Sequence, residues 1–466
     1  MVFNHETITT KKGCYYLNKK VSFYANDIIN KDILRKFWNS FSFGHSDIEF
    51  MQTDDLVFYT DIAKQVELGE YTYAINVETD GIFVKAKDEK GLISGFMTLI
   101  DLIKMDDDGN VKIDCCEIYE SPYIKKRMIH FCVFPETEIW ELKKFVRLCG
   151  ALKYTHVVIE FWGMLKFDCL KELSWDNAFT KDMIRPIVKE ANEMGIEIIP
   201  MFNHWGHAAQ CRIIHGKHVV LDQNPKLQYL FDDTGWCWNF LSSKTKNLLK
   251  NIRYELIELC GDGSYFHIGC DEAEGFSYTK EKMDEVCEYI NEVNADISSY
   301  GRKAIMWADM FLYKKPLYEN ENIYGGAPTE KAAEYMLDSV DKNIVMADWQ
   351  YSCTKTPIET SILLKNAGFD VLICPWGRDF ESDSVEVCLD TIKDYNVDGI
   401  MHTTWHTLSN GTMYVGKVAM ESWTKSTKDT VPVYAAKTAS IQRKVCFADG
   451  NYERSGWARL QISTRT

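Results

Sequence analysis

The sequence predicts an α/β protein in which a (β/α)8 TIM barrel follows a small α+β domain, and two patterns carry this prediction. From about residue 124 to 404, short apolar segments alternate with amphipathic ones, and eight strand and helix units are what a closed parallel barrel requires. Before residue 120, short runs alternate apolar and polar residues, as in a sheet with one exposed face. We therefore expect an accessory domain at residues 1–120, a catalytic barrel at 121–425 and a C-terminal extension at 426–466 that packs on the barrel.

The first 120 residues predict a sheet with one helix against it. Tyr71–Val77 and Ile82–Ala86 flank the turn sequence Glu-Thr-Asp-Gly and predict a β-hairpin. Further strands are expected at Val21–Tyr24 and Asp55–Tyr59. Gly91–Lys104 has apolar residues at helical spacing, so we expect it to pack on the sheet.

The barrel prediction rests on a run of alternating elements. The expected strands are Arg127–Phe134, His156–Phe161, Gly195–Phe202, Tyr265–Gly269, Lys303–Trp307, Asn343–Asp348, Asp370–Cys374 and Gly399–Thr404. The expected helices are Glu138–Leu152, Lys181–Met194, Ser243–Cys260, Lys282–Ser299, Glu330–Val340, Ile358–Ala367 and Ser384–Tyr395. An open doubly wound sheet would normally stop sooner, so the count favours a barrel.

Charge and cysteine usage exclude some classes of partner. The 466 residues contain 53 Lys and Arg against 68 Asp and Glu, a net charge of -15, which argues against nucleic acid. The 15 cysteines are scattered and form no CxxC pairs, so we expect reduced thiols in the cytoplasm. We see no signal peptide and no apolar run of membrane-spanning length, so no membrane partner is expected. The oligomeric state stays open, with a homodimer as one alternative.

Two adjacent carboxylates follow the fourth expected strand. Successive strand side chains point to opposite faces, so Asp271 and Glu272 can share a site only if the strand ends there and the backbone turns. The alternative is that both are surface charges at the start of the next helix. Their position at a strand end favours function, because barrel enzymes carry their chemistry on the loops after the strands.

Aromatic residues at other strand ends predict a sugar pocket. Trp307, Trp349, Trp376 and Trp405 stand at four consecutive strand ends, where one tryptophan alone would more often be packing. Aromatic walls with a few polar groups suit a sugar ring, whose C–H faces stack on aromatic rings while its hydroxyls take hydrogen bonds.

The spacing of the two acids predicts that each has a different catalytic role. Hydrolysis of a glycosidic bond needs an acid for the leaving oxygen and a second group that stabilises the transition state, and neighbouring residues cannot easily flank one bond. We therefore expect Glu272 to be the acid, with a pKa raised by its pocket and by Asp271, and His207 to orient it. Asp271 would hold an acetamido group of the substrate that itself attacks the anomeric carbon.

His267-Ile268-Gly269-Cys270-Asp271-Glu272 resembles the H-x-G-x-D-E signature of family 20 glycoside hydrolases, the β-N-acetylhexosaminidases. The resemblance implies a retaining exo-enzyme that releases terminal β-linked N-acetylglucosamine or N-acetylgalactosamine through an oxazolinium-type intermediate. It implies that Asp271 orients the acetamido group and that Glu272 is the acid/base. Arg127 resembles the arginine that binds ring hydroxyls in that family, and Trp307, Trp349 and Trp405 stand where the family has pocket tryptophans. No cofactor and no metal are implied.

The sequence departs from the family pattern around the substrate, which indicates a divergent subgroup. Asn203 and Thr407 stand where the family usually has acidic residues, and Glu160 is the expected substitute carboxylate that supports His207. Tyr351 is the candidate for the tyrosine that contacts the acetamido group. The substrate-binding residues expected are Arg127, Glu160, Asn203, His207, Trp307, Trp349, Tyr351, Trp376 and Trp405.

Two other functions are weighed against this one. A metal-dependent barrel hydrolase could use His204, His207, His267 and Asp309, although the two loop histidines lie too close in sequence for a firm ligand motif. A non-catalytic sugar-binding protein would keep the tryptophans but would be expected to lose the acid first. The intact acid pair favours an enzyme.

Overall fold

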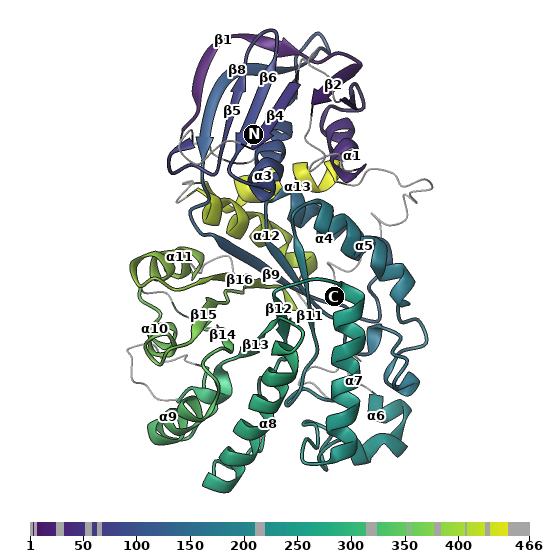
Figure 1. Cartoon of the computed structure of the whole chain (residues 1–466), viewed down its shortest axis with the longest axis vertical. Helices are drawn as coiled ribbons and strands as arrows, with labels where there is room; N and C mark the ends of the chain where they lie inside the picture. Colours follow the sequence, from purple (N-terminus) through teal and green to yellow (C-terminus); the bar gives the residue numbers. More distant parts are fainter. Residues whose placement is uncertain are drawn as a thin grey trace.

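The computed structural model describes residues 3, 7–24, 32–51, 58–62, 68–209, 220–313, 324–351, 353, 356–376, 384–405, 408–424 and 429–445. These residues form a mixed sheet followed by a closed eight-stranded barrel, drawn one above the other in Figure 1. The predicted fold class, a TIM barrel preceded by a small α+β domain, is confirmed. The exact domain boundaries stay a prediction.

The N-terminal sheet has the strand order β1-β8-β5-β6-β4-β2-β3, and β7 pairs with β8. Its strands are β1 (Thr9–Tyr16), β2 (Lys20–Tyr24), β3 (Asp47–Met51), β4 (Phe58–Ile62), β5 (Tyr73–Val77), β6 (Ile82–Ala86), β7 (Lys104–Met105) and β8 (Val111–Glu120). The predicted hairpin is confirmed as the antiparallel pair β5 and β6. The first part of the strand expected at 55–59 lies outside the described residues.

Two helices, α1 (Asp32–Phe41) and α3 (Glu89–Asp101), belong to the sheet domain. Helix α3 begins after Asp88, whose carboxylate accepts the backbone N–H of Gly91 at 2.7 Å. Gly95 lets the helix lie close to the sheet, because a Cβ there would stand 2.9 Å from a methyl group of Val84. The predicted packing of this helix on the sheet is confirmed.

The barrel closes in chain order, with the last strand pairing with the first. Its strands are β9 (Lys126–Cys132), β10 (His156–Glu160), β11 (Glu197–Met201), β12 (Tyr265–His267), β13 (Lys303–Trp307), β14 (Val345–Asp348), β15 (Asp370–Ile373) and β16 (Gly399–Thr403). Each overlaps a predicted strand. Backbone pairing continues past β12, because Ile268 N–H donates to the Ile305 carbonyl and Trp307 N–H donates to the Gly269 carbonyl.

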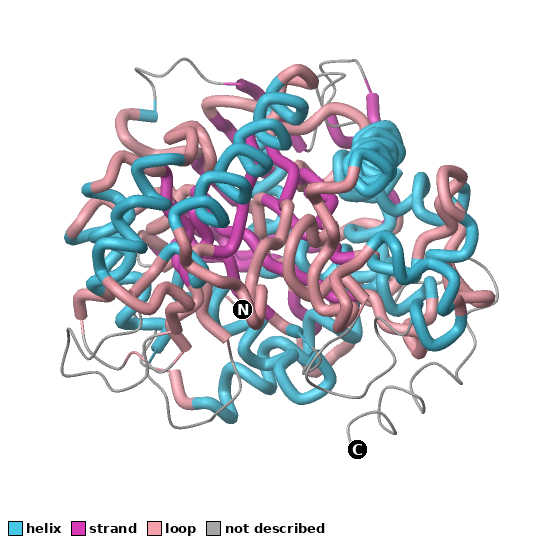
Figure 2. The backbone as a smooth tube through the Cα atoms, turned by 90° about the horizontal axis from the view of Figure 1, so that it is seen from below, coloured by secondary structure: helices cyan, strands magenta, loops and turns pink. Residues whose placement is uncertain are grey.

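Helices surround the barrel strands, which lie at the centre of the view in Figure 2. The longer ones are α4 (Ile139–Ala151), α5 (Lys181–Glu193), α7 (Ser243–Cys260), α8 (Lys280–Ser298), α9 (Glu330–Ser339), α10 (Glu359–Asn366), α11 (Ser384–Asp394), α12 (Leu408–Trp423) and α13 (Val431–Lys444). A short helix, α6 (Val220–Gln223), precedes α7. In the described part of the chain, no helix combines the length and apolar character needed to cross a membrane.

The sheet domain and the barrel meet at a buried cluster of polar and aromatic side chains. Helices α12 and α13 lie between the two parts in Figure 1. Trp423, at the end of α12, donates its indole N–H to a Glu120 carboxylate oxygen at 2.9 Å. The Lys153 ammonium lies 4.0 Å from the centre of the Trp423 ring and also bonds the Thr98 hydroxyl. These contacts join β8, α12 and the loop before β10, so the two parts share one buried core.

Alternate residues of each barrel strand point to the barrel axis and form a separate apolar cluster there. Members of this cluster are Met128, Val158, Ile199, Met201, Ile305, Trp307, Val345, Ala347, Trp349, Leu372, Cys374 and Met401. The side chains between them on the strands, such as Ile129 and Ile159, pack outward in the main core under the helices. This alternation decides which strand-end residues reach the pocket.

Candidate active site

The alternation that fills the barrel also sends Asp271 toward the axis. Tyr265 packs on the inner cluster and His267 lies with its ring 4.5 Å from that of Trp307, whereas Phe266 and Ile268 pack outward. Asp271 continues the inward series after His267 and is 4% exposed. The surface-charge alternative is therefore wrong for Asp271.

His207 brings the two acids together. Its Nε2 atom lies 3.0 Å from Glu272 Oε2 and 3.7 Å from Asp271 Oδ2. Among the described residues, the other oxygen of Asp271, Oδ1, is buried and has no hydrogen-bond partner. Burial raises the pKa of Asp271 to about 6, His207 opposes the shift, and the Glu272 charge adds to it. The expected proximity of Asp271, Glu272 and His207 is what the structure shows.

The loops that carry these groups are tightly interlocked. Gly206 lies against the backbone of the acid pair, where an added Cβ would stand 2.0 Å from the carbonyl oxygen of Asp271. His207, Cys270 and Glu272 have positive φ angles of 53°, 76° and 45°, a region that costs non-glycine residues free energy. Strained backbone of this kind persists only where surrounding contacts enforce it, and it often marks functional sites.

Asp309 lies directly behind the acid. Its Oδ2 accepts the backbone N–H of Glu272 at 2.9 Å, and its Oδ1 accepts the indole N–H of Trp349 at 3.2 Å. Burial and the nearby Asp271 charge raise the pKa of Asp309, while the two N–H donors oppose that shift. A third carboxyl group thus belongs to the site.

The expected aromatic residues meet in one wall. The Trp405 indole N–H donates to the Tyr351 hydroxyl at 2.6 Å, and the Trp307 ring lies 5.5 Å from that of Trp405. Tyr351 also lies 5.2 Å, centre to centre, from both Trp349 and Trp376. The side chains of β13, β14, β15 and β16 that were predicted to line a pocket are therefore in contact through Tyr351 and Trp405.

Two expected substrate contacts have other neighbours. Glu160 points inward, and its carboxylate lies 3.2 Å from His130 Nε2 and accepts a hydrogen bond from the Cys132 thiol at 3.0 Å. Asn203 is 3% exposed and packs on Gly269, where an added Cβ would stand 1.7 Å from its Oδ1. Glu160 still acts on the site electrostatically, because its charge contributes to the raised pKa of Asp271.

Arg127 does not lie in the pocket, and its expected role is wrong. It lies near the start of β9, and its side chain points to the outer side of the barrel, as that of Ile129 does. Its guanidinium donates to the carbonyls of Ile124, Lys125 and Lys153 and lies 4.8 Å from the centre of the Trp423 ring. Arg127 is thus part of the junction between the sheet domain and the barrel, at the end opposite the acids.

Sequence reasoning missed two aromatic residues of the site. Trp236 donates its indole N–H to the Glu272 carbonyl at 2.5 Å, and its ring lies 5.1 Å from that of His207. Tyr324 lies 4.4 Å from the Trp349 ring. Both stand in loops far from strand ends, and no sequence pattern marks them. Thr407, expected to face outer hydroxyls, lies outside the described residues.

The donors of the metal-hydrolase alternative do not come together. His204 and His267 are buried, burial lowers the pKa of both, and His204 Nδ1 lies 2.6 Å from the Phe202 carbonyl. In the described part of the chain, the side chains with the spacing of metal ligands are instead His130, Cys132 and Glu160. Hydrogen bonds among these three already account for their spacing.

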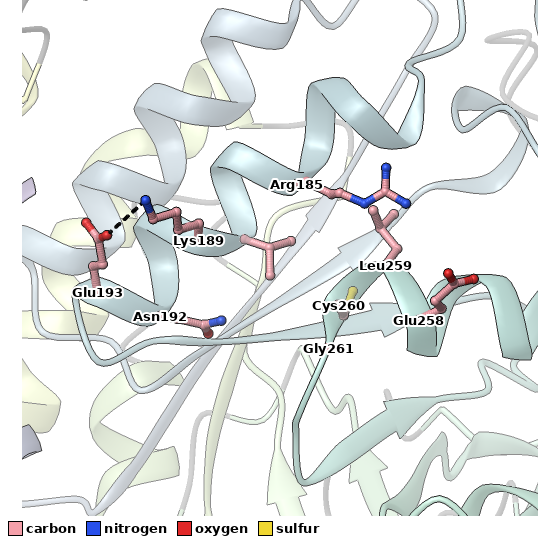
Figure 3. A pocket seen from close by; sticks show the side chains of 9 residues that line it. Arg185, Lys189, Asn192, Glu193, Glu258, Leu259, Cys260 and Gly261 are labelled. Atoms are coloured by element: carbon pink, nitrogen blue, oxygen red, sulfur yellow. Dashed lines mark ion pairs between the residues drawn. The ribbon is translucent and has the colours of Figure 1, made fainter.

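A surface groove lies elsewhere. Figure 3 shows it between α5 and α7, with Glu193, Glu258 and Gly261 near the ends of these helices and an ion pair between Lys189 and Glu193. Helix C-termini in a parallel barrel lie at the face opposite the strand ends. The groove is therefore separate from the acids.

Comparisons with known proteins agree with this geometry. Residues 162–378 match the family model described as Glycosyl hydrolase family 20, catalytic domain. The chain is 23% identical over 291 residues to Lacto-N-biosidase of Bifidobacterium bifidum, covering 58% of this chain and 25% of that protein. It is 22% identical over 353 residues to the β-hexosaminidase subunit beta of Mus musculus, covering 66% of this chain and 64% of that one. The chain thus spans less than two thirds of these curated relatives.

A solved structure shows the same fold along the whole chain. The β-N-acetylhexosaminidase from Bacteroides fragilis superimposes with a TM-score of 0.71 at 16% sequence identity, covering 97% of this chain and 98% of that one. The matched family segment contains His207, Asp271, Glu272, Trp307 and Trp349. The chain therefore contains a segment, residues 162–378, that matches the catalytic domain of glycosyl hydrolase family 20.

Proposed function

We propose that this protein is a retaining exo-β-N-acetylhexosaminidase that hydrolyses terminal β-linked N-acetylglucosamine or N-acetylgalactosamine by substrate-assisted catalysis. One observation carries the proposal. Asp271 presents a buried oxygen, Oδ1, that has no partner among the described residues, directly beside an acid held by His207. A buried carboxylate oxygen without a donor is costly, and an acetamido N–H would satisfy it.

The reaction follows from this arrangement. Glu272 gives its proton to the glycosidic oxygen as the bond between that oxygen and the anomeric carbon breaks. The carbonyl oxygen of the acetamido group attacks the anomeric carbon from the opposite side, which forms an oxazolinium ion. Asp271 accepts the acetamido N–H and stabilises the positive charge that develops. Water, deprotonated by Glu272, then attacks the anomeric carbon and opens the oxazolinium ring. Two inversions at the anomeric carbon leave its configuration retained.

His207 supports the proton transfer. An imidazole that donates from Nε2 to Glu272 Oε2 fixes the rotamer of the acid, and the 3.0 Å distance allows this bond. Asp271 cannot serve as a nucleophile in the same scheme, because it is adjacent to Glu272 in the chain and the two would have to flank the bond. Adjacency therefore favours an internal nucleophile on the substrate.

The aromatic wall supports recognition of one sugar ring. Tyr351 and Trp405 lie on the inner side of the barrel mouth with Trp307, whose buried indole Nε1 has no hydrogen-bond partner among the described residues. Apolar ring faces stack on a pyranose, and a free indole N–H can donate to a hydroxyl or carbonyl oxygen.

The test is a set of initial rates on nitrophenyl glycosides. N-acetylglucosaminide and N-acetylgalactosaminide are compared with the corresponding plain hexosides, and the Glu272→Gln variant is the control for the acid. We expect hydrolysis of at least one N-acetyl substrate, inhibition by a thiazoline mimic of the intermediate, and no turnover of plain hexosides. Equal rates on plain hexosides, or an unchanged rate for Glu272→Gln, would contradict the proposal.

A further inference from the structure

We propose that Asp309 is a positioning residue for the acid, acting together with Trp236 by holding both polar groups of the Glu272 backbone. The inference rests on the proposed function, in which Glu272 donates a proton to the leaving group. It adds two residues that touch neither the bond that breaks nor the acetamido group.

The contacts fix Glu272 from two sides. Asp309 Oδ2 accepts the Glu272 backbone N–H at 2.9 Å, and Trp236 Nε1–H donates to the Glu272 carbonyl at 2.5 Å. The same carbonyl also accepts the backbone N–H of Glu274 at 2.7 Å. Asp309 comes from the end of β13 and Trp236 from the loop between β11 and α7, so two separate elements hold the two peptide groups that flank the Glu272 Cα.

The backbone of Glu272 needs such support. Its φ angle is 45°, in the left-handed region that is sterically unfavourable for a residue with a Cβ. The hydrogen bonds to Asp309 and Trp236 stabilise this conformation against its steric cost. If they were removed, the backbone could relax to a negative φ, and the carboxylate would move away from its partner His207.

Both supporting side chains are themselves held. Asp309 uses its second oxygen for the indole N–H of Trp349 and begins a short 3-10 helix, Asp309–Phe311. The loop of Trp236 is tied by Asp232, whose Oδ1 accepts the backbone N–H groups of Thr234 and Trp236. Rigid supports of this kind set the position of a catalytic group to a fraction of an ångström.

An asparagine at position 309 would break the arrangement with little change in shape. Asn has one carbonyl oxygen and one amino group, so it cannot accept N–H bonds from both Glu272 and Trp349. One of the two donors would face another donor. The variant therefore tests the support of the acid while the volume of the side chain is kept.

The experiment measures kcat/KM for a series of aryl N-acetylhexosaminides that differ in leaving-group acidity, from nitrophenyl to methoxyphenyl. Wild type is compared with Asp309→Asn, Trp236→Phe and Glu272→Gln. A residue that acts through the acid matters most where the leaving group needs a proton. For Asp309→Asn we expect a loss of roughly 10- to 100-fold on the methoxyphenyl substrate and a much smaller loss on the nitrophenyl one. Trp236→Phe should show the same trend with a smaller loss, because the Glu274 N–H still bonds the carbonyl.

Asp348→Asn is the matched control for general damage to the fold. Asp348 is also a buried carboxylate at a strand end, but it accepts hydrogen bonds from Thr360, Ser361 and Gln350, away from the acids. This variant should melt at a lower temperature and lose activity by the same factor on every substrate. A uniform loss for Asp309→Asn would overturn the inference. If Asp309→Asn does not fold, Trp236→Phe decides, and its own uniform loss would overturn it. If wild type hydrolyses none of the series, the proposed function fails, and the role of Asp309 with it.

Discussion

His207 Nε2 lies 3.0 Å from Glu272 Oε2, although 65 residues separate the two in the chain. The histidine follows β11 and the glutamate follows β12, so neighbouring strands deliver an acid and its partner to one point. The positive φ angles of both residues, 53° and 45°, show that the two loops turn sharply to make this contact.

Replacing His207 tests this contact directly. In His207→Asn the shorter side chain should no longer reach Glu272, so the acid loses its fixed rotamer. We expect kcat/KM on a methoxyphenyl N-acetylhexosaminide, whose leaving group needs the proton, to fall by about 10- to 100-fold, within the range of general acid catalysis. Steady-state kinetics check this, with circular dichroism melting as the control for folding. An unchanged kcat/KM would remove His207 from the mechanism.

Asp271 should control the acid side of the pH profile. Burial raises its pKa to about 6, so the carboxylate that accepts the acetamido N–H is lost below that pH. We expect kcat/KM to fall as the pH drops through about 6 in wild type. Asp271→Asn should lose about 10²–10³-fold at neutral pH, comparable to the loss of an oxyanion-hole donor. A profile for Asp271→Asn that keeps the same acid limb would assign that limb to another group.

The raised pKa of Asp271 also predicts that removing this carboxylate stabilises the protein at neutral pH. The pKa of Asp271 rises from 3.8 to about 6 on folding, so the folded state binds a proton more tightly than the unfolded state. This contribution to stability is present below pH 3.8 and is lost as the pH rises through about 6. Asp271→Asn, which cannot ionise, should therefore unfold at a higher denaturant concentration than wild type at neutral pH. A lower midpoint would show that lost hydrogen bonds outweigh the relief of the buried charge.

Tyr351 links the walls of the pocket. Its hydroxyl accepts the indole N–H of Trp405, so Tyr351→Phe would leave that donor without its bond and Trp405 less firmly placed. Loss of such a bond costs about 1 kcal/mol, or several-fold, and more if the hydroxyl also contacts substrate. We expect KM for the N-acetyl substrate to rise and the affinity for a thiazoline inhibitor to fall. Inhibitor titration checks this, and equal affinity for both proteins would contradict it.

Arg127 should affect stability without affecting catalysis. Its guanidinium donates to three backbone carbonyls at the junction, so Arg127→Met would leave buried acceptors unsatisfied at a cost of roughly 2–4 kcal/mol. We expect a lower melting temperature and an unchanged KM for the folded fraction. A raised KM at full folding would return Arg127 to the substrate pocket.

Much of the fold could be predicted because the barrel repeats one physical pattern. Each strand segment is apolar and short, each helix is amphipathic, and β13 was expected with the bounds that it has, Lys303–Trp307. The acid pair was predictable for the same reason, since strand ends of a barrel carry its chemistry.

The failures have equally specific causes. The family resemblance predicts that Arg127 lies in the pocket. In β9, however, Arg127 comes directly before Met128, whose side chain points to the barrel axis, so the side chain of Arg127 points outward. Trp236 was missed because it reaches the acid from the middle of a long loop, and strand ends alone do not predict such a loop. Glu160 is predicted as a carboxylate that supports His207, but the sequence could not show that His130 and Cys132 would be its neighbours.

Gly206 limits how this active site can be grafted onto another barrel. Because its backbone lies where any Cβ would collide with the Asp271 carbonyl, the loop after β11 and the loop after β12 can only be exchanged as a pair. If the acid pair were grafted onto another barrel without the loop after β11, a residue other than glycine at the position of Gly206 would collide with the Asp271 backbone. The smallest portable unit of this site is therefore two adjacent strand ends, and the Asp-Glu dipeptide alone is not enough.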